Sequence, residues 1–251
     1  MEWPSYTSYA SLFPSLIEEP LTGLPSFESH SPIWKILDPN STNSLKQQLM
    51  HLIGNQSSSE QLEQLGATID ETNGPVVIDP SARIEPSTHF IGPCYVGPEA
   101  IVRHGAYIRE NSWICSTALV GHCSEIKHSI LLPGSKAPHF NYVGDSILGK
   151  GVNLGAGVKL SNLRNDGGEV FLRLDGKRVP SGLRKFGAIL GENTQLGCNA
   201  VTNPGTVLGC SSVVWPNVTV TGVHSNQSIH RLIRWLVDYL LQMEFVVKST
   251  R

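Results

Sequence analysis

The sequence is poor in charge and has no surplus of basic residues. Only 16% of its 251 residues are Asp, Glu, Lys or Arg, and the formal net charge is -2. Nucleic-acid-binding domains usually carry a clear excess of Lys and Arg, so the composition argues against that class. No apolar run approaches the roughly 18 residues of a membrane span, and the first residues lack the regions of a signal peptide. We therefore expect a cytoplasmic protein that binds neither nucleic acid nor membrane.

The sequence also lacks paired cysteines. It has five, an odd number, and no two of them form a CxxC pair. A disulfide framework or a zinc motif is therefore not supported. A metal site built from His122, Cys123 and Glu125 is also disfavoured, because neighbouring side chains on a strand point to opposite faces.

A repeat of six residues is the dominant feature that is present. Apolar side chains recur at every sixth position, first at Ile78, Ile84, Phe90, Val96, Val102, Ile108, Ile114, Val120, Ile126 and Leu132, then at Leu190, Leu196, Leu208, Val214 and Val220, with Thr202 as the polar exception. Three such hexapeptides form one triangular coil with its apolar residues on the axis, and stacked coils pair their backbone groups. The predicted fold class is mainly β, a left-handed parallel β-helix.

Three parts follow from this pattern. Residues 1–72 form a Pro/Ser-rich, short-helical extension that packs on the first coil or mediates assembly. Residues 73–226 form the β-helix, and residues 227–251 carry the apolar spacing of a C-terminal capping helix. Residues 161–187 interrupt the repeat with six basic residues and predict a protruding loop with a hairpin at Asp175-Gly176. This loop either binds an anionic ligand or is a solvated, disordered insertion.

His139 lies in the segment GSKAPHFNYVGD, where the six-residue register slips between Leu132 and Val143. A lone histidine is either a general base, a metal ligand or a structural residue. Irregularities in a repeat often mark functional sites, and the glycine-rich run 155–157 lets a ligand approach the backbone. The sequence favours a functional role for His139. His122 and His128 are interpreted as surface positions, with a place in an acceptor pocket as the alternative.

The segments GSKAPHFNYVGD and GKGVNLGAG resemble the GSKAxHLxYLGD and GDNVNIGAG segments of a known family. This is the acetyltransferase domain of the bifunctional UDP-N-acetylglucosamine pyrophosphorylase/glucosamine-1-phosphate N-acetyltransferases. The chain is also similar to archaeal sugar-1-phosphate nucleotidylyltransferases with a C-terminal acetyltransferase domain. The resemblance, over residues 78–231, implies a homotrimeric acyltransferase. It would use acetyl-CoA and an amino sugar phosphate in UDP-N-acetylglucosamine biosynthesis for the cell envelope.

The resemblance also implies residue roles. His139 would be the general base, and Ala156 would present its backbone N–H to the thioester. The other matching positions would bind the amino sugar phosphate (Arg109, Lys127, Tyr142, Asn153 and Asn162) or coenzyme A (Cys198, Pro216 and Arg231). The chemistry is consistent, because releasing an amine from its ammonium form needs a base with a pKa near seven. The thioester supplies the leaving group, so no metal or covalent intermediate is required.

The sequence departs from the family in two respects. Residues 1–72 are too short for the nucleotidylyltransferase domain, and no GTRM-type loop occurs, so we expect no uridylyltransferase activity. In the protruding loop, Gly168 and Phe171 replace lysines and Leu163 replaces a tyrosine. Two alternatives stay open: a non-catalytic module for assembly or regulation that partners a separate nucleotidylyltransferase, and an acyltransferase with a different acceptor or acyl chain.

Overall fold

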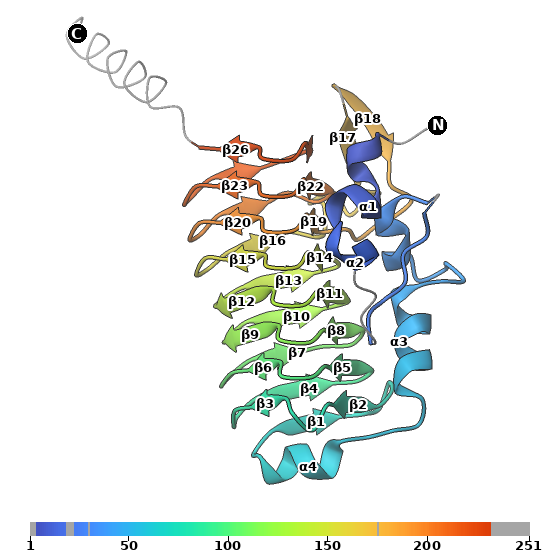
Figure 1. Ribbon diagram of the computed structural model, residues 1–251, viewed down its shortest axis with the longest axis vertical. Helices are drawn as coiled ribbons and strands as arrows, with labels where there is room; N and C mark the ends of the chain where they lie inside the picture. The colour runs from blue at the N-terminus through green and yellow to red at the C-terminus, as the bar shows by residue number, and fades with distance from the viewer. Residues whose placement is uncertain (1–3, 19–22, 30, 175, 232–251) are drawn as a thin grey trace, which may run out of the picture.

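The computed structural model describes residues 4–18, 23–29, 31–174 and 176–231. Three parallel sheets of eight strands each form the faces of a long prism, and strands that are neighbours in a sheet belong to successive coils (Figure 1). The predicted left-handed parallel β-helix is confirmed.

Within each face the strands follow one another in space from coil to coil. Sheet A contains β1 (Thr68–Asp70), β4 (His89–Ile91), β7 (Tyr107–Ile108), β10 (Glu125–Lys127), β13 (Tyr142–Gly144), β16 (Lys159–Leu160), β21 (Val201–Thr202) and β24 (Thr219–Val220). Sheet B contains β2 (Val76–Ile78), β5 (Cys94–Val96), β8 (Ser112–Ile114), β11 (Ser129–Leu131), β14 (Ile147–Leu148), β19 (Ala188–Leu190), β22 (Thr206–Leu208) and β25 (Val223–His224). Sheet C contains β3 (Arg83–Ile84), β6 (Ile101–Val102), β9 (Leu119–His122), β12 (Lys136–His139), β15 (Asn153–Leu154), β20 (Gln195–Leu196), β23 (Val213–Val214) and β26 (Ile229–His230).

The axis of the prism is built from the repeat residues, with one correction. From Ile78 to Ile126, and again from Leu190 to Val220, the apolar repeat positions are buried in one continuous core. Leu132 is not on the axis; Leu131 is, in register with Ile114. The register therefore slips between Ile126 and Leu131, one strand earlier than the sequence predicted. Leu132 points outward and packs in a second apolar cluster.

That second cluster joins sheet B to the N-terminal extension. The extension contains η1 (Ser5–Thr7), α1 (Tyr9–Leu12), α2 (Ser15–Glu18), η2 (Ile33–Leu37), α3 (Leu45–Ile53) and α4 (Ser59–Gln64). Its chain runs along the outside of sheet B over much of the length of the prism (Figure 1). Only α4 lies at the first coil, where Leu62 enters the axial core. The extension thus covers one face of the prism, because sheet B presents apolar side chains outward as well as inward.

The prism itself extends beyond the predicted range at both ends. Strand β1 begins before residue 73, and β26 lies within the range expected to be the C-terminal helix. Ile229 pairs in register with Val213, so the repeat continues into one more strand. Residues 232–251, where most of that predicted helix falls, lie outside the described residues. In the part of the chain that is described, no helix has the length and apolar character needed to cross a membrane.

The interrupting segment 161–187 is an ordered hairpin. Strands β17 (Phe171–Leu174) and β18 (Lys177–Pro180) pair antiparallel around the predicted turn. One face of the segment is apolar and buried, and it packs in the second cluster through Val170, Leu172, Leu174, Val179, Leu183 and Phe186. The interpretation as a disordered insertion was wrong, because these apolar residues alternate with the basic ones and anchor the loop.

Candidate active site

His139 lies at the corner where sheet C turns into sheet A. Strand β12 ends there, and Phe140 takes a left-handed backbone conformation with φ 53°. The corner is held by the buried side chain of Asn141, whose Oδ1 accepts from His139 N at 3.0 Å and whose Nδ2 donates to Gly155 O at 2.8 Å. The imidazole of His139 is exposed and makes no hydrogen bond to another described residue. The ring is therefore free to contact a substrate.

The predicted coenzyme residues line up along the same edge. Ala156 lies one coil beyond His139, since Gly157 N donates to His139 O at 2.9 Å. Asn199 N donates to Ala156 O and Asn217 N to Cys198 O, so Ala156, Cys198 and Pro216 follow one another in a column. At about 4.8 Å per coil, the column runs roughly 14 Å from His139 to Pro216. The N–H of Ala156 has no acceptor among the described residues.

Arg231 lies just beside this column. Strand β26 pairs with β23 so that His230 lies next to Val214, and Trp215 N donates to His230 O at 2.8 Å. Arg231 therefore follows beside Trp215, one position short of Pro216. Trp215 is half exposed, at 51%. The four predicted coenzyme residues thus lie on one edge, with His139 at its beginning.

Two predicted acceptor residues converge on the outer face of sheet A. A Cβ added to Gly144 would lie 2.6 Å from Tyr142 Oη and 2.8 Å from Asn162 Nδ2, so both side chains lie directly over this glycine. Asn162 Nδ2 also donates to Asp145 Oδ2. Burial raises the pKa of Tyr142, and the charges of Asp145 and Glu125 add to this effect. The phenol is therefore neutral and can donate a hydrogen bond.

Arg109 and Lys127 lie beside each other on the same face. Arg109 N donates to Ile126 O, which places it next to Lys127 on the following coil. Arg109 Nη1 lies 2.9 Å from Glu125 Oε1, and its Nε lies 3.5 Å from Glu110 Oε2. Burial alone would lower the pKa of Arg109, but the hydrogen bond to Glu125 and the two carboxylate charges raise it. Arg109 is thus held by carboxylates, whereas Lys127 forms only a long ion pair among the described residues, 4.0 Å from Glu110.

Asn153 is not brought to this group within one chain. It opens β15 on sheet C, where it pairs with Lys136 at the beginning of β12. His139 ends that strand three residues later, which corresponds to about 10 Å along it. Asn153 and the pair formed by Tyr142 and Asn162 therefore face outward from different sheets.

A cavity of about 430 Å³ lies at the corner between sheets A and B. The prism contributes Lys127, His128 and Asp145, and the hairpin segment contributes Arg184 and Lys185. The N-terminal extension contributes its residues 37–40. From the sequence, Arg184 and Lys185 are predicted only as part of a basic loop. Their position near the point where the repeat resumes, at Leu190, was the available signal that they return to the prism.

The interpretation of His128 as a surface position was wrong. His128 is only 7% exposed, and its Nε2 donates to Leu37 O at 3.0 Å. The N-terminal extension covers this corner, and no sequence pattern around His128 predicts that contact. His122 is a surface residue, stacked on His104 with ring centroids 5.4 Å apart. No group of three metal-ligating side chains is found among the described residues.

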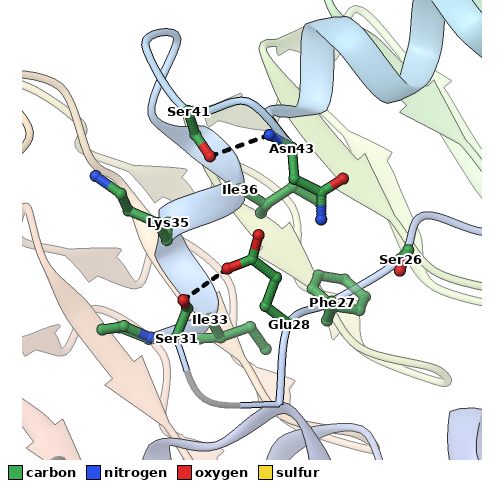
Figure 2. Close-up of a pocket in the computed structure, with 10 residues that line it drawn as sticks. Ser26, Phe27, Glu28, Ser31, Ile33, Lys35, Ile36, Ser41 and Asn43 are labelled. Atoms are coloured by element: carbon green, nitrogen blue, oxygen red, sulfur yellow. Dashed lines mark hydrogen bonds between the residues drawn. The ribbon is translucent and has the colours of Figure 1, made fainter.

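A second cavity lies within the extension itself and is too small for a substrate. Figure 2 shows it between Ser26, Phe27, Glu28 and Ser31 on one side and Ser41 and Asn43 on the other, with Ser31 Oγ donating to Glu28 Oε2 at 2.6 Å. Its volume is about 10 Å³, which corresponds to a single water molecule.

The comparisons agree with the family seen in the motifs. Residues 90–179 match the family model described as GMPPB C-terminal domain. The chain is 34% identical over 189 residues to a bifunctional sugar-1-phosphate nucleotidylyltransferase/acetyltransferase of Sulfurisphaera tokodaii, covering 74% of this chain and 44% of that protein. The predicted resemblance is confirmed.

A second bifunctional protein is also similar to the chain. The bifunctional protein GlmU of Methanococcus vannielii is 38% identical over 131 residues, covering 52% of this chain and 29% of that protein. The chain thus spans less than half the length of these curated relatives. Among solved structures, the polySia specific acetyltransferase NeuO gives a TM-score of 0.37 at 15% identity, covering 65% of this chain and 82% of that chain. A superposition this loose carries no information on function.

Proposed function

We propose that this chain is a coenzyme A-dependent N-acetyltransferase whose acceptor is an amino sugar phosphate similar to glucosamine 1-phosphate. The observation that carries the proposal is that His139 lies where two surfaces meet. One is the edge along which Ala156, Cys198 and Pro216 follow one another, where we place the extended thioester. The other is the face of sheet A, which leads past Tyr142 to the cations around Lys127.

The mechanism follows from this placement. The acceptor amine lies at the corner, where His139 takes a proton from it as its nitrogen attacks the thioester carbonyl. The unpaired N–H of Ala156 donates to the oxygen that becomes negative. When the C–S bond breaks, the imidazolium returns its proton to the leaving thiolate. Tyr142 and Asn162 hold the sugar, and Lys127, at the sheet A side of the cationic cavity, reaches its phosphate, so that amine and carbonyl are kept in reach.

The replacement of the family's loop lysines and tyrosine is weaker evidence against acetyl transfer than the sequence alone indicated. Leu163 forms an isolated bridge with Lys185, and Phe186 N donates to Asn162 O at 2.9 Å. A lysine is thereby held close to Asn162 although Gly168 and Phe171 replace lysines elsewhere. This favours the enzyme over the non-catalytic module, which drew its support from the lost lysines.

We further propose a homotrimer with active sites between neighbouring prisms. The N-terminal extension covers sheet B, and Asn153 lies on sheet C, away from the other acceptor residues. A neighbouring prism packed against the edge between sheets A and C would bring Asn153 of one copy toward Tyr142 of another. A mass of one subunit in analytical ultracentrifugation at micromolar concentration would contradict this. We expect no uridylyl transfer by this chain.

The test of the function is thiol release from acetyl-CoA in the presence of glucosamine 1-phosphate. His139→Ala should lower the rate by a factor on the order of 10²–10⁴ and leave coenzyme A binding intact. The matched control is His104→Ala, an exposed histidine at the same corner of an earlier coil. Release that requires both the sugar and His139 supports the proposal.

Two other results have different meanings. Coenzyme A binding without release would point to another acceptor or acyl chain. Neither binding nor release would favour the non-catalytic module.

A further inference from the structure

The cavity beside Lys127 has one wall that does not belong to the β-helix. Residues Leu37–Asn40, at the end of η2, line it opposite the prism. Leu37 and His128 are both buried, and the bond from His128 Nε2 to Leu37 O joins them. The wall is therefore fixed to the corner of the prism, where the register slips between Ile126 and Leu131.

The same part of the extension also holds the hairpin segment. The rings of Trp34 and Phe186 stack with centroids 5.7 Å apart, and Trp34 Nε1 donates to Ser181 O at 3.3 Å. Arg184 and Lys185 lie between these two anchored positions. Residues 33–40 thus fix both the wall of the cavity and the segment that carries two of its cations.

The charges around the cavity favour an anion. Lys127, Arg184 and Lys185 line it, and its two carboxylates already have partners. Asp38 pairs with Lys35 Nζ at 2.5 Å and accepts from Asn40 N at 3.0 Å, and Asp145 accepts from Asn162. A phosphate monoester carries a charge of about -1.5 to -2 near neutral pH, which suits the surplus of cations.

We propose that Leu37–Asn40 is part of the acceptor site, with Asn40 facing the anionic group of the acceptor. Asn40 is exposed and lines the cavity, so a ligand can reach its side chain, which also interacts with the Asp38 carboxylate. The N-terminal extension then selects the acceptor together with the β-helix. The identity of the acceptor as an amino sugar phosphate rests on the proposed function, whereas binding of an anion at this wall does not.

The experiment changes the charge of Asn40 without changing its size. Asn40→Asp should weaken the binding of inorganic phosphate, and raise KM for glucosamine 1-phosphate, by a factor on the order of ten at low salt. The effect should shrink as ionic strength rises. The matched control is Asn55→Asp, an exposed asparagine of the same extension that does not line the cavity. Coenzyme A affinity should not change in either variant.

The opposite substitution guards against a general loss of structure. Asn40→Lys should strengthen phosphate binding, a gain that partial unfolding cannot produce. The proposal is overturned if wild type does not bind phosphate, or if Asn40→Asp and Asn55→Asp bind it equally well. Phosphate binding that depends on Asn40 in a protein without acetyl transfer would support the wall and refute the proposed function. Acetyl transfer whose KM for glucosamine 1-phosphate does not change in Asn40→Asp would support the proposed function and refute the role of the wall.

Discussion

Gly144→Ala tests the face of sheet A, because the missing side chain of Gly144 makes room for two predicted acceptor residues. An added Cβ would lie 2.6 Å from Tyr142 Oη and 2.8 Å from Asn162 Nδ2, whereas ordinary contact begins at 3.4 Å. The backbone of Gly144 is not in the left-handed region, so alanine itself is not strained. The two polar groups must therefore move outward by about 0.6 to 0.8 Å to restore ordinary contact.

The expected effect on activity is larger than the effect on stability. Overpacking costs about 1–3 kcal/mol in a core, and the half-buried Tyr142 can yield, so we expect a loss near the lower end. A displacement of about 1 Å at a reacting geometry can cost on the order of 10²-fold in rate, and for this somewhat smaller displacement we expect kcat/KM to fall by a factor on the order of ten to a hundred. Coenzyme A affinity should remain that of wild type.

The assay is thiol release at varied glucosamine 1-phosphate, with thermal unfolding measured on the same samples. Gly168→Ala is the matched control, because its Cβ would meet its nearest atom, Asp166 Oδ1, at 3.4 Å and its backbone is also outside the left-handed region. Wild-type kcat/KM in Gly144→Ala would refute the reasoning, since Tyr142 and Asn162 would then not position the acceptor.

Three further outcomes are expected. Trp34→Ala should lower the free energy of unfolding in urea by about 3–5 kcal/mol, because this side chain is 1% exposed; a loss below about 1 kcal/mol would contradict its anchoring role. Saturating coenzyme A should slow iodoacetamide labelling of the exposed Cys198 but not of the exposed Cys123 on an earlier coil, as read by peptide mass spectrometry; equal protection would place the coenzyme elsewhere. Burial lowers the pKa of His230 below its ordinary value of 6.5, so the folded state resists protonation of this side chain. The melting temperature should therefore fall as pH drops below about 6.5. His230→Gln should flatten that dependence, and an unchanged slope would show that His230 does not cause it.

The axis of the β-helix could be predicted from the sequence because stacking imposes the same burial on every coil. Ile78 and Val220 lie more than a hundred residues apart and still obey one rule, since each contacts only its own coil and the next. The sequence also predicts that the six-residue register slips once, but it does not predict the correct position. Leu131 and Leu132 are both apolar and both buried, one on the axis and one under the extension. Pattern alone cannot distinguish two buried surfaces on either side of a strand.

The register slip lies at the cationic cavity and not at His139. Ser129 pairs with Ser112, whereas Glu125 pairs with Tyr107, so the coil loses one residue at the corner of Lys127 and His128. The sequence interpretation attached the irregularity to His139, at the opposite end of the strands of sheet A. The predicted base lies in regular register, with His139 directly beside His122. The shortened corner lies instead at the cationic cavity.

The wall of that cavity could not be predicted, because the contacts that form it join distant segments without a repeat. Trp34 reaches Ser181 across 147 positions, and Leu37 meets His128 across 91. Their geometry depends on the shape of a finished prism, against which the extension packs. This also explains why the family motifs do not reveal the wall: they lie on the β-helix, whereas residues 33–40 lie outside the matched residues 90–179. If Asn40 faces the acceptor, relatives that share the β-helix motifs but carry a different chain over sheet B would differ in acceptor at this corner while keeping the same base at the other.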